Sequence, residues 1–194
     1  MEEKKQTRRQ QAENTKRHIF HTALKLLEEQ DFEDIKIKDI VSAANVSVGS
    51  FYNYFTSKLD VYYETYQLAD EYFATTVAAK MIHPTARERI LCFFDEYAKY
   101  CSELTDIKLT KLLYTSSNTH FERVSEVGMR NVLQQQVQLG LDNGELHAAL
   151  SAIDIVQFLM ISVRGLVYNW CTRNGDYNLR TAMEAYVSRL LCSL

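Results

Sequence analysis

The residues best suited to chemistry in this 194-residue chain lie close together, between residues 35 and 58. The strip reads IKIKDIVSAANVSVGSFYNYFTSK and combines hydroxyl, amide, aromatic and lysine side chains. Hydroxyl and amide groups donate and accept hydrogen bonds at the edges of bases, and lysine ammonium groups neutralise phosphates. The strip is therefore a candidate for the recognition of a nucleic acid.

The same strip has the spacing of two short helices joined by a tight turn. Apolar residues recur at helical spacing before and after Asn45, although residues 35–38 alone alternate like a strand. Asparagine tolerates the left-handed backbone of such a turn best among the non-glycine residues, and Ser47 is placed to cap the second helix. We predict a helix-turn-helix in which Phe51 and Phe55 anchor the second helix while its other face enters a major groove.

The rest of the chain predicts an all-α fold. One proline and six glycines supply too little turn chemistry for a sandwich or barrel of short strands. A first helix is expected to begin near Asn14 or Thr15 and to end before Gln30. A boundary near residue 56 separates a small head, residues 1–56, from a larger body, residues 57–194. The helices expected in the body span residues 57–80, 85–103, 106–114, 119–142, 151–173 and 179–191.

The run VSVGSFYNYFTSKLDV at residues 46–61 is similar to the signature that ends the helix-turn-helix of TetR-family transcriptional repressors and opens their fourth helix. The similarity covers about residues 15–65, and the body agrees with the family in helix number and lengths alone. Asn45 replaces the family's turn glycine, and Ile37 replaces a threonine or serine at the start of the second helix. The resemblance implies a three-helix DNA-binding head with a basic N-terminal arm, and a helical body, about nine helices in all, that binds an effector and dimerises.

The resemblance also implies which residues contact DNA. Tyr52 would pack on a sugar or a thymine methyl group, and Lys58 would bind a phosphate as a point charge. Lys36 or Lys38 would replace the phosphate contact that Ile37 removes. The remaining contacts are divided between the DNA backbone, for Ser47 and Gly49, and the bases, for Ser50 and Asn53, with Tyr54 nearby.

A homodimer through the last two helices is a further expectation. The helix expected at residues 151–173 is apolar almost all round, so it must be covered on both sides. A second copy would cover it and present two recognition helices to a pseudo-palindromic operator. The resemblance places a small-molecule effector inside the body, although aromatic residues there would serve equally as plain core. The residues expected to contact the effector are Phe94, Tyr97, Tyr114, Phe121, Gln157 and Arg164.

Charge and cysteine content limit the other possibilities. The net charge is -3, but residues 1–58 carry ten Lys and Arg against nine Asp and Glu, and the basic residues cluster ahead of the first apolar run. That arm is either a solvated tail or a segment lying beside DNA. Four widely spaced cysteines and the lack of an apolar secretory segment indicate reduced thiols in a cytoplasmic protein. Residues 152–170 are interrupted by polar side chains, which favours a buried helix over a membrane span.

The sequence therefore predicts a DNA-binding transcriptional regulator, in the simplest case a ligand-responsive repressor, with no cofactor and no metal site. An effector-independent architectural DNA-binding protein of the same fold is the alternative. A helical-bundle enzyme is disfavoured, because no histidine has a glutamate three residues before it, as a di-iron site requires. No P-loop or dinucleotide-binding glycine motif occurs either.

Overall fold

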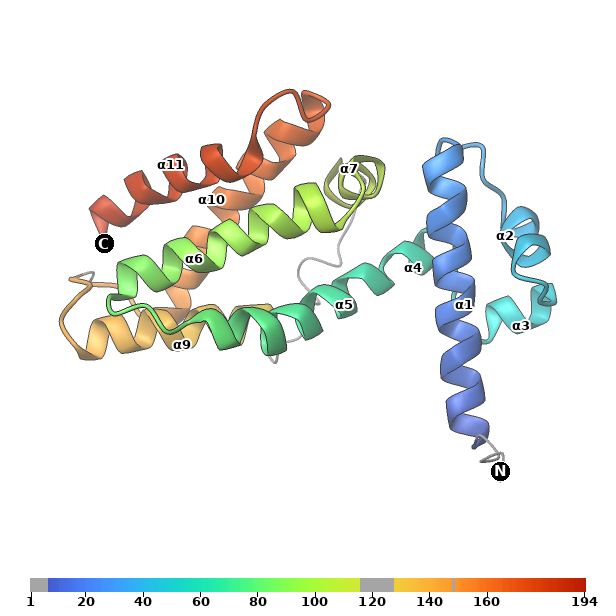
Figure 1. The fold of residues 1–194 in the computed structure, drawn as a ribbon, viewed down its shortest axis with the longest axis horizontal. Coiled ribbons are helices and arrows are strands. Elements are labelled where there is room, and N and C mark those ends of the chain that lie inside the picture. Colours follow the sequence, from blue (N-terminus) through green and yellow to red (C-terminus); the bar gives the residue numbers. More distant parts are fainter. Residues whose placement is uncertain (1–6, 116–127, 148) are drawn as a thin grey trace. The chain divides into compact units, whose positions relative to one another are not determined.

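The computed structural model describes residues 7–115, 128–147 and 149–194, and these residues form helices without strands (Figure 1). The prediction of an all-α fold is confirmed. Contacts group the chain into an N-terminal unit, residues 1–64, and a C-terminal unit, residues 65–194.

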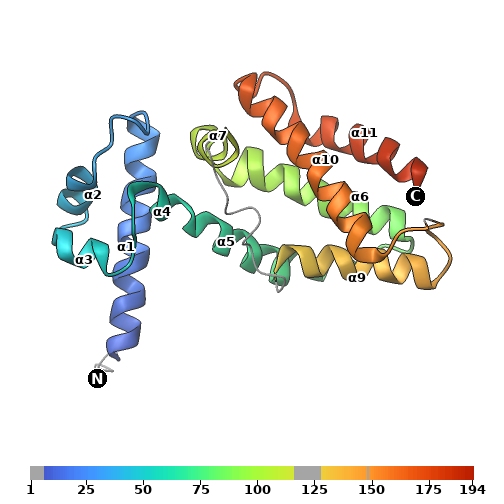
Figure 2. The ribbon, with the colours of Figure 1, turned by 180° about the vertical axis from the view of Figure 1, so that it is seen from behind.

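The N-terminal unit is built on one long helix. In Figures 1 and 2, α2 and α3 lie on the same side of α1, and α4 also packs against α1. The helices are α1 (Arg8–Glu29), α2 (Ile37–Ala43), α3 (Val48–Tyr52) and α4 (Lys58–Tyr62). Apolar side chains from all four helices and the segments between them fill a small core, which includes Ile19, Phe20, Ala23, Leu27, Ile35, Ile40, Phe51, Phe55 and Val61.

Helix α1 begins six residues before the expected Asn14. Thr7 and Gln10 form a capping box: the Thr7 hydroxyl accepts a hydrogen bond from the Gln10 N–H at 3.3 Å, and the Gln10 side chain accepts one from the Thr7 N–H at 2.9 Å. Such reciprocal bonds satisfy the N–H groups that a helix start leaves open. The expected start near Asn14 was wrong, and part of the basic arm is helical.

The C-terminal unit continues from α5 (Glu64–Tyr72), which starts at the last residue of the N-terminal unit. The helix expected at residues 57–80 is not continuous, because Tyr63 separates α4 from α5 and the end of the segment is wound as a π-helix and a short 3₁₀ turn. The start of the helix expected at residue 119 lies outside the described residues. The remaining helices are α6 (Ala86–Lys99), α7 (Ile107–Thr115), α9 (Met129–Asp142), α10 (Ala152–Thr172) and α11 (Leu179–Leu190).

Helix α10 supplies much of the core of this unit. It packs against α7, α9 and α11, while α6 packs against α9 and α11 (Figures 1 and 2). Ile155, Leu159, Val163 and Val167 recur every four residues along α10 and are all fully buried. By length and composition α10 is apolar enough to cross a membrane. Its buried stripe identifies it as a core helix.

The end of α6 widens into a π-helix, Tyr100–Leu104. The N–H of Thr105 donates to the carbonyl of Tyr100, five residues earlier, at 3.0 Å. The hydroxyl of Thr105 donates to the same carbonyl at 2.6 Å, and that of Thr110 donates to the carbonyl of Cys101 at 2.8 Å. These hydroxyl groups satisfy carbonyls that the wider turn exposes.

Candidate nucleic-acid interface and ligand cavity

The turn between α2 and α3 has the geometry that the sequence predicts. Asn45 has a φ of 51°, in the left-handed region that asparagine tolerates. The N–H of Val46 donates to the carbonyl of Val41 at 3.0 Å and closes the turn. His18 of α1 hydrogen-bonds through Nε2 to the carbonyl of Ala44 at 3.2 Å, which ties the turn to the long helix.

Helix α3 is capped and anchored as expected. The Ser47 hydroxyl accepts a hydrogen bond from the N–H of Ser50 at 3.0 Å. Phe51 is fully buried, and its ring contacts that of Phe55, which is also buried, at a centroid separation of 5.6 Å. These two rings fix which face of α3 points outward.

The outward face carries the residues expected to contact DNA. Tyr52 is 55% exposed, and Gly49 and Asn53 are exposed beside it on the short helix and its C-terminal cap. Ser50 and Tyr54 are half-buried. A side chain at Gly49 would meet only the Ser47 hydroxyl, at 3.9 Å, so there is open space over this part of α3. Glycine thus leaves room for a phosphate backbone to approach closely.

Basic residues lie on both sides of this face in the sequence. Lys36 and Lys38 are exposed at the start of α2, where the N–H of Lys36 donates to the Asp39 carboxylate at 2.9 Å. On α1, Arg8, Arg9 and Arg17 are exposed. Lys16 differs from them, because it forms an ion pair with Glu64 inside the unit. Not every lysine or arginine of this unit is therefore available to bind a phosphate.

Lys58 has a structural partner that the sequence did not reveal. Its ammonium group donates to the carbonyl of Ile35 at 2.7 Å and to that of Phe32, and it lies 3.9 Å from the centroid of the Phe32 ring. These bonds tie α4 to the segment between α1 and α2. One of its three N–H groups remains for a phosphate.

Tyr62 makes a second tie between α4 and α1. Its hydroxyl donates to the carbonyl of Ala23 at 3.0 Å, and the side chain is fully buried, which raises the pKa of the phenol far above its usual value. Ser57 caps α4 by accepting from the N–H of Asp60 at 3.0 Å. The fourth helix is thus held to α1 and to the segment before α2 by polar contacts as well as by packing.

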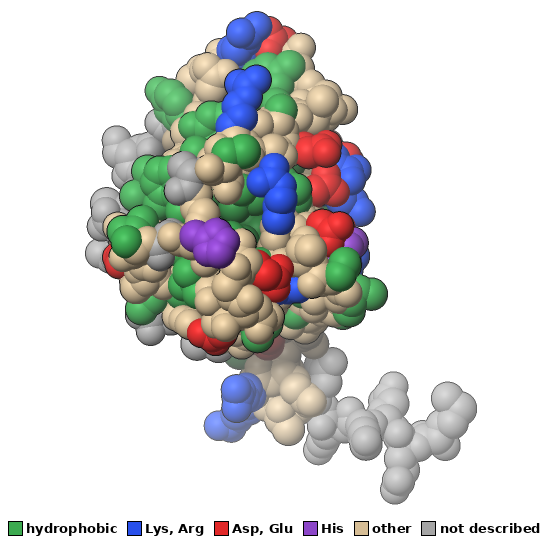
Figure 3. Space-filling view, turned by 90° about the vertical axis from the view of Figure 1, so that its left-hand side faces the viewer, with side chains coloured by type: hydrophobic (Ala, Val, Ile, Leu, Met, Phe, Trp, Pro, Cys, Tyr) green, Lys and Arg blue, Asp and Glu red, His purple; other side chains and the backbone are tan. Residues whose placement is uncertain are grey.

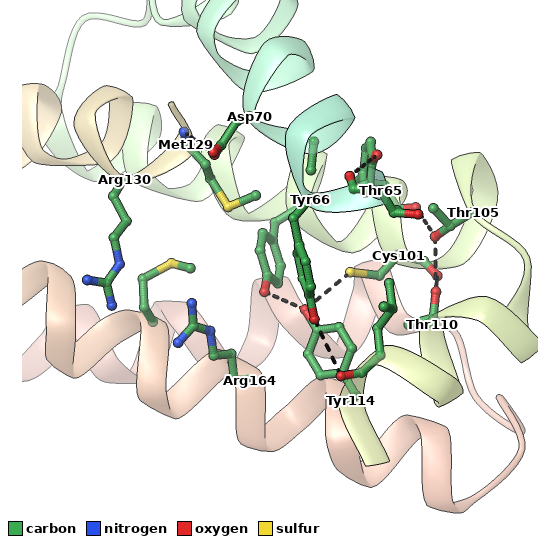
Figure 4. A pocket seen from close by; sticks show the side chains of 15 residues that line it. Thr65, Tyr66, Asp70, Cys101, Thr105, Thr110, Tyr114, Met129, Arg130 and Arg164 are labelled. Atoms are coloured by element: carbon green, nitrogen blue, oxygen red, sulfur yellow. Dashed lines mark hydrogen bonds between the residues drawn. The ribbon is translucent and has the colours of Figure 1, made fainter. Parts of the chain in front are cut away.

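A second candidate site lies inside the C-terminal unit, where five helices and the π-helix enclose a ligand cavity (Figure 4). The cavity has a volume of about 60 Å³. Its residues come from segments far apart in the sequence: Thr65, Tyr66, Ala69, Asp70, Tyr97, Tyr100, Cys101, Thr105, Thr110, Leu113, Tyr114, Met129, Arg130, Met160 and Arg164.

The structure brings together three of the six residues expected to contact an effector. Tyr97, Tyr114 and Arg164 line the cavity. Phe94 does not: it is fully buried in the core, where its ring packs against those of Phe93 and Tyr97 instead of facing the cavity. Gln157 is exposed on α10, on the side away from the core, and Phe121 lies outside the described residues.

Sequence reasoning missed other lining residues, above all Asp70, Tyr100 and Arg130. A charged residue within an apolar helical run was the signal that selected Arg164. Asp70 and Arg130 lie in helices that contain many other polar residues, so a charge there gives no such signal. Tyr100 continues the winding of α6 and lies three residues after Tyr97, on the same side of the helix, so this spacing was the signal that could have found it.

Phenol and thiol groups meet in the cavity. The hydroxyl groups of Tyr97 and Tyr114 share a hydrogen bond of 2.5 Å, and the Cys101 sulfur lies 3.7 Å from the Tyr114 oxygen (Figure 4). Burial raises the pKa of both Tyr97 and Cys101 to about 12. These groups are neutral at pH 7, so they offer hydrogen bonds rather than charge.

Asp70 is fixed at the start of α9. It accepts a hydrogen bond from the N–H of Met129 at 3.0 Å, where the N-cap residue Gly128 has no side chain to do so. A Cβ atom at Gly128 would lie 2.3 Å from the Asp70 carboxyl group. Only glycine at position 128 lets the Asp70 carboxyl group come this close. Asp70, a residue of α5, therefore caps the N-terminus of α9.

The last two helices expose apolar side chains. On α10, Ile153 is 61% exposed and Ile161 is 60% exposed, and Tyr168 follows on the same side. Gly165 lies between them, and a Cβ atom there would meet nothing within 4 Å. Tyr186 of α11 is also exposed. Hydrophobic side chains, broken by a few charged ones, are visible on the face of the C-terminal unit in Figure 3.

The sequence of the N-terminal unit is similar to known regulatory proteins. Residues 19–64 match the family model described as bacterial regulatory proteins, tetR family. The chain is 32% identical over 62 residues to the HTH-type transcriptional regulator AcrR of Shigella flexneri, a match that spans 32% of this chain and 29% of the relative.

Solved structures resemble the chain over most of its length. The transcriptional regulator FadR of Bacillus subtilis, in complex with stearoyl-CoA, is 19% identical with a TM-score of 0.73 over 91% of this chain and 98% of that one. RolR in complex with resorcinol is 16% identical with a TM-score of 0.71 over 95% and 90% of the two chains. At these identities the likeness shows the fold.

Proposed function

We propose that this chain is a repressor of the TetR family that binds a pseudo-palindromic operator as a homodimer and releases it when a small molecule fills the ligand cavity. The observation that carries the proposal is the outward face of α3. There Tyr52 and Asn53 are exposed on a helix whose opposite face is fixed by Phe51.

The outward face suits a major groove. The groove of B-DNA is about 12 Å wide and admits one helix, whose side chains then reach the base edges. Asn53 offers an amide that can bond to a base in two places, and Tyr52 offers a ring and a hydroxyl group. The exposed Lys36 and Lys38, and the arginines of α1, supply positive charge for the phosphates on either side.

The test is the selection of bound duplexes from a random DNA pool by the purified chain, at near-physiological salt. We expect enrichment of a pseudo-palindrome, and loss of that enrichment with Tyr52→Ala. Tyr52→Phe, which keeps the ring, is the matched control and should retain the sequence preference. Failure of the folded wild-type chain to enrich any sequence would contradict the proposal.

The dimer is supported by the exposed apolar face of α10 and α11. Ile161, Gly165 and Tyr168 follow one another at spacings of four and three residues, which places them on one side of the helix. A glycine in open space lets a second helix approach closely, and a dimer of this kind uses the same face of both copies. Gln157, exposed four residues before Ile161, lies on the same side.

Two substitutions test the dimer. Ile161→Glu and Gly165→Arg place charge on the proposed interface, and we expect sedimentation to show a monomer with weakened operator binding. Ile82→Glu is the matched control, since Ile82 is 85% exposed elsewhere in the same unit. Unchanged dimers of both interface variants would place the contact on another surface.

The ligand cavity favours an effector-responsive regulator over an architectural DNA-binding protein. Architectural binding needs no internal cavity, whereas here arginine, tyrosine and aspartate side chains converge on one. A ligand that fits one conformation of the C-terminal unit better than another would shift the protein towards that conformation in proportion to its preference. Operator release by such a ligand is the behaviour to be tested.

A further inference from the structure

The charge of the ligand cavity is uneven. Its lining includes one carboxylate, Asp70, and two guanidinium groups, those of Arg130 and Arg164. All its other side chains are neutral at pH 7. Two cations against one anion in a mostly apolar pocket favour an anionic ligand.

Asp70 is poorly placed to balance both arginines. One of its oxygen atoms is committed to the N–H of Met129 at 3.0 Å. Burial also raises the pKa of this carboxyl group, because desolvation disfavours its charged form. In Figure 4 the carboxyl group points towards Met129, and the guanidinium of Arg130 extends away from it.

Arg130 has an unused donor. Its Nε atom is buried and has no hydrogen-bond partner within the described part of the chain. A buried N–H that has lost its water without gaining another partner destabilises the site, and the cost is larger on a charged group. A guanidinium presents its N–H groups in a planar fork that matches the two oxygens of a carboxylate.

Arg164 adds positive charge in the same part of the cavity. Its cation acts on the buried phenol of Tyr97, where it lowers a pKa that burial raises to about 12. In the view of Figure 4, the guanidinium groups of Arg130 and Arg164 lie towards one end of the cavity, and the ring of Tyr114 lies further along it. The cavity therefore has a cationic end and an aromatic end.

The size and the walls restrict the body of the ligand. The 60 Å³ of open space corresponds to about four to six water molecules at roughly 10–15 Å³ each. Tyr66, Tyr97, Tyr100 and Tyr114 supply ring surfaces, and Met129 and Met160 supply pliable thioethers. Such walls suit a single planar ring better than a long chain.

We infer that the effector is a compact aromatic carboxylate, held by Arg130 through its carboxylate and packed with its ring against the tyrosines. The inference rests on the proposed effector function and specifies the ligand class of that same cavity. Arg164 lies beside the carboxylate and adds to the positive potential there. The ligand differs in class from stearoyl-CoA and from resorcinol, which the FadR and RolR structures contain.

Direct binding of two matched probes tests the ligand class. Benzoate and benzamide have the same ring and nearly the same shape, and only benzoate is charged. We expect calorimetric titration of the full-length chain to give at least tenfold tighter binding of benzoate, since hydrogen bonds to charged groups are the stronger ones. Equal binding of the two probes, or binding of neither, would overturn the inference.

Variants of the arginine test the placement. Arg130→Gln should weaken benzoate at least tenfold and leave benzamide unchanged, while the exposed Arg189→Gln should change neither. Should Arg130→Gln fail to fold, Arg130→Lys keeps the charge without the planar fork and should bind benzoate more weakly than wild type does. Wild-type affinity for benzoate in that variant would remove Arg130 from the site.

Operator binding separates this inference from the proposed function. The ligand-free chain is measured on the selected DNA in parallel with the titrations. Operator binding without discrimination between the probes would overturn the ligand class alone. If the chain discriminates between the probes but enriches no DNA sequence, the proposed repressor function would be overturned instead.

Discussion

The two units place their functional residues in opposite ways. In the N-terminal unit most candidate contacts lie on the outside of the short helix α3 or close to it in the sequence, within residues 36–58. In the C-terminal unit the candidate contacts line an internal cavity, and they are spread along the chain from Thr65 to Arg164. An outward site depends on a local motif, whereas an inward site depends on the packing of the whole unit.

This difference has a physical consequence for mutation. An exposed side chain can be removed without leaving a cavity, so its loss changes binding and leaves the free energy of unfolding nearly the same. A side chain that lines a cavity also packs against its neighbours, so its loss changes both quantities. Binding and stability should therefore be separable in the N-terminal unit and coupled in the C-terminal unit.

The largest effect is expected on the outward face of α3. The double substitution Tyr52→Ala and Asn53→Ala should reduce operator affinity about 100-fold, since good base contacts contribute roughly 1–3 kcal/mol each. Thermal unfolding should be unchanged, because both side chains are exposed. Fluorescence anisotropy with the selected operator measures the first quantity, and calorimetry measures the second. A large loss of stability would break the contrast between the units.

A glycine in the C-terminal unit gives the next largest effect. A Cβ atom at Gly140 of α9 would lie 2.6 Å from the Cβ of Ala86, so these segments approach as closely as glycine allows. Gly140→Val should reduce the free energy of unfolding by about 2 kcal/mol, as overpacking does. Gln135→Val, on an exposed position of the same helix, controls for the β-branched side chain. Denaturant titration that finds equal losses would argue against close packing at Gly140.

Substitution of Lys58 tests whether operator binding and stability can be changed separately throughout the N-terminal unit. Lys58→Met removes the donor to the Phe32 and Ile35 carbonyls and should cost about 1.5 kcal/mol of stability. If its remaining N–H reaches a phosphate, the salt slope of operator binding also falls by about one. Lys38→Met, on an exposed position, should lower the slope without the loss of stability. A stable Lys58→Met protein would show that the carbonyl bonds contribute little.

The smallest effect is expected at the turn before α3. Asn45→Ala should destabilise the N-terminal unit by about 1 kcal/mol, because alanine is penalised in the left-handed region. Asn45→Gly, which carries no such penalty, should be close to wild type. Thermal unfolding compares the two, and equal losses would mean that the asparagine side chain, rather than the backbone conformation, holds the turn.

The sequence predicted the N-terminal unit well because each of its features is local. Asn45, the Ser47 cap and the aromatic anchors lie within eleven residues, and each has a preferred conformation of its own. It could not predict that Lys58 bonds to carbonyls of the segment before α2, since that contact joins residues 23 and 26 positions apart.

The ligand cavity was predicted only in part, for a related reason. Helical periodicity says that Phe94 and Tyr97 are both buried, and it does not say which of them faces a cavity. That choice depends on how α6 meets α5 and α7, and on the π-helix that follows α6. Arg164 was found because a charge inside an apolar helix is conspicuous in any packing.

The π-helix at Tyr100–Leu104 also marks a position where the chain could lose one residue without losing its helical structure. A π-turn holds one residue more than the α-turn it interrupts, so deletion of a single residue there would restore regular winding rather than break the helix. Such a deletion would change the direction of the lining residues that follow it, Thr105 among them, while leaving α6 in register. Single-residue gains and losses at this point would thus be a route by which relatives with the same fold come to bind different ligands.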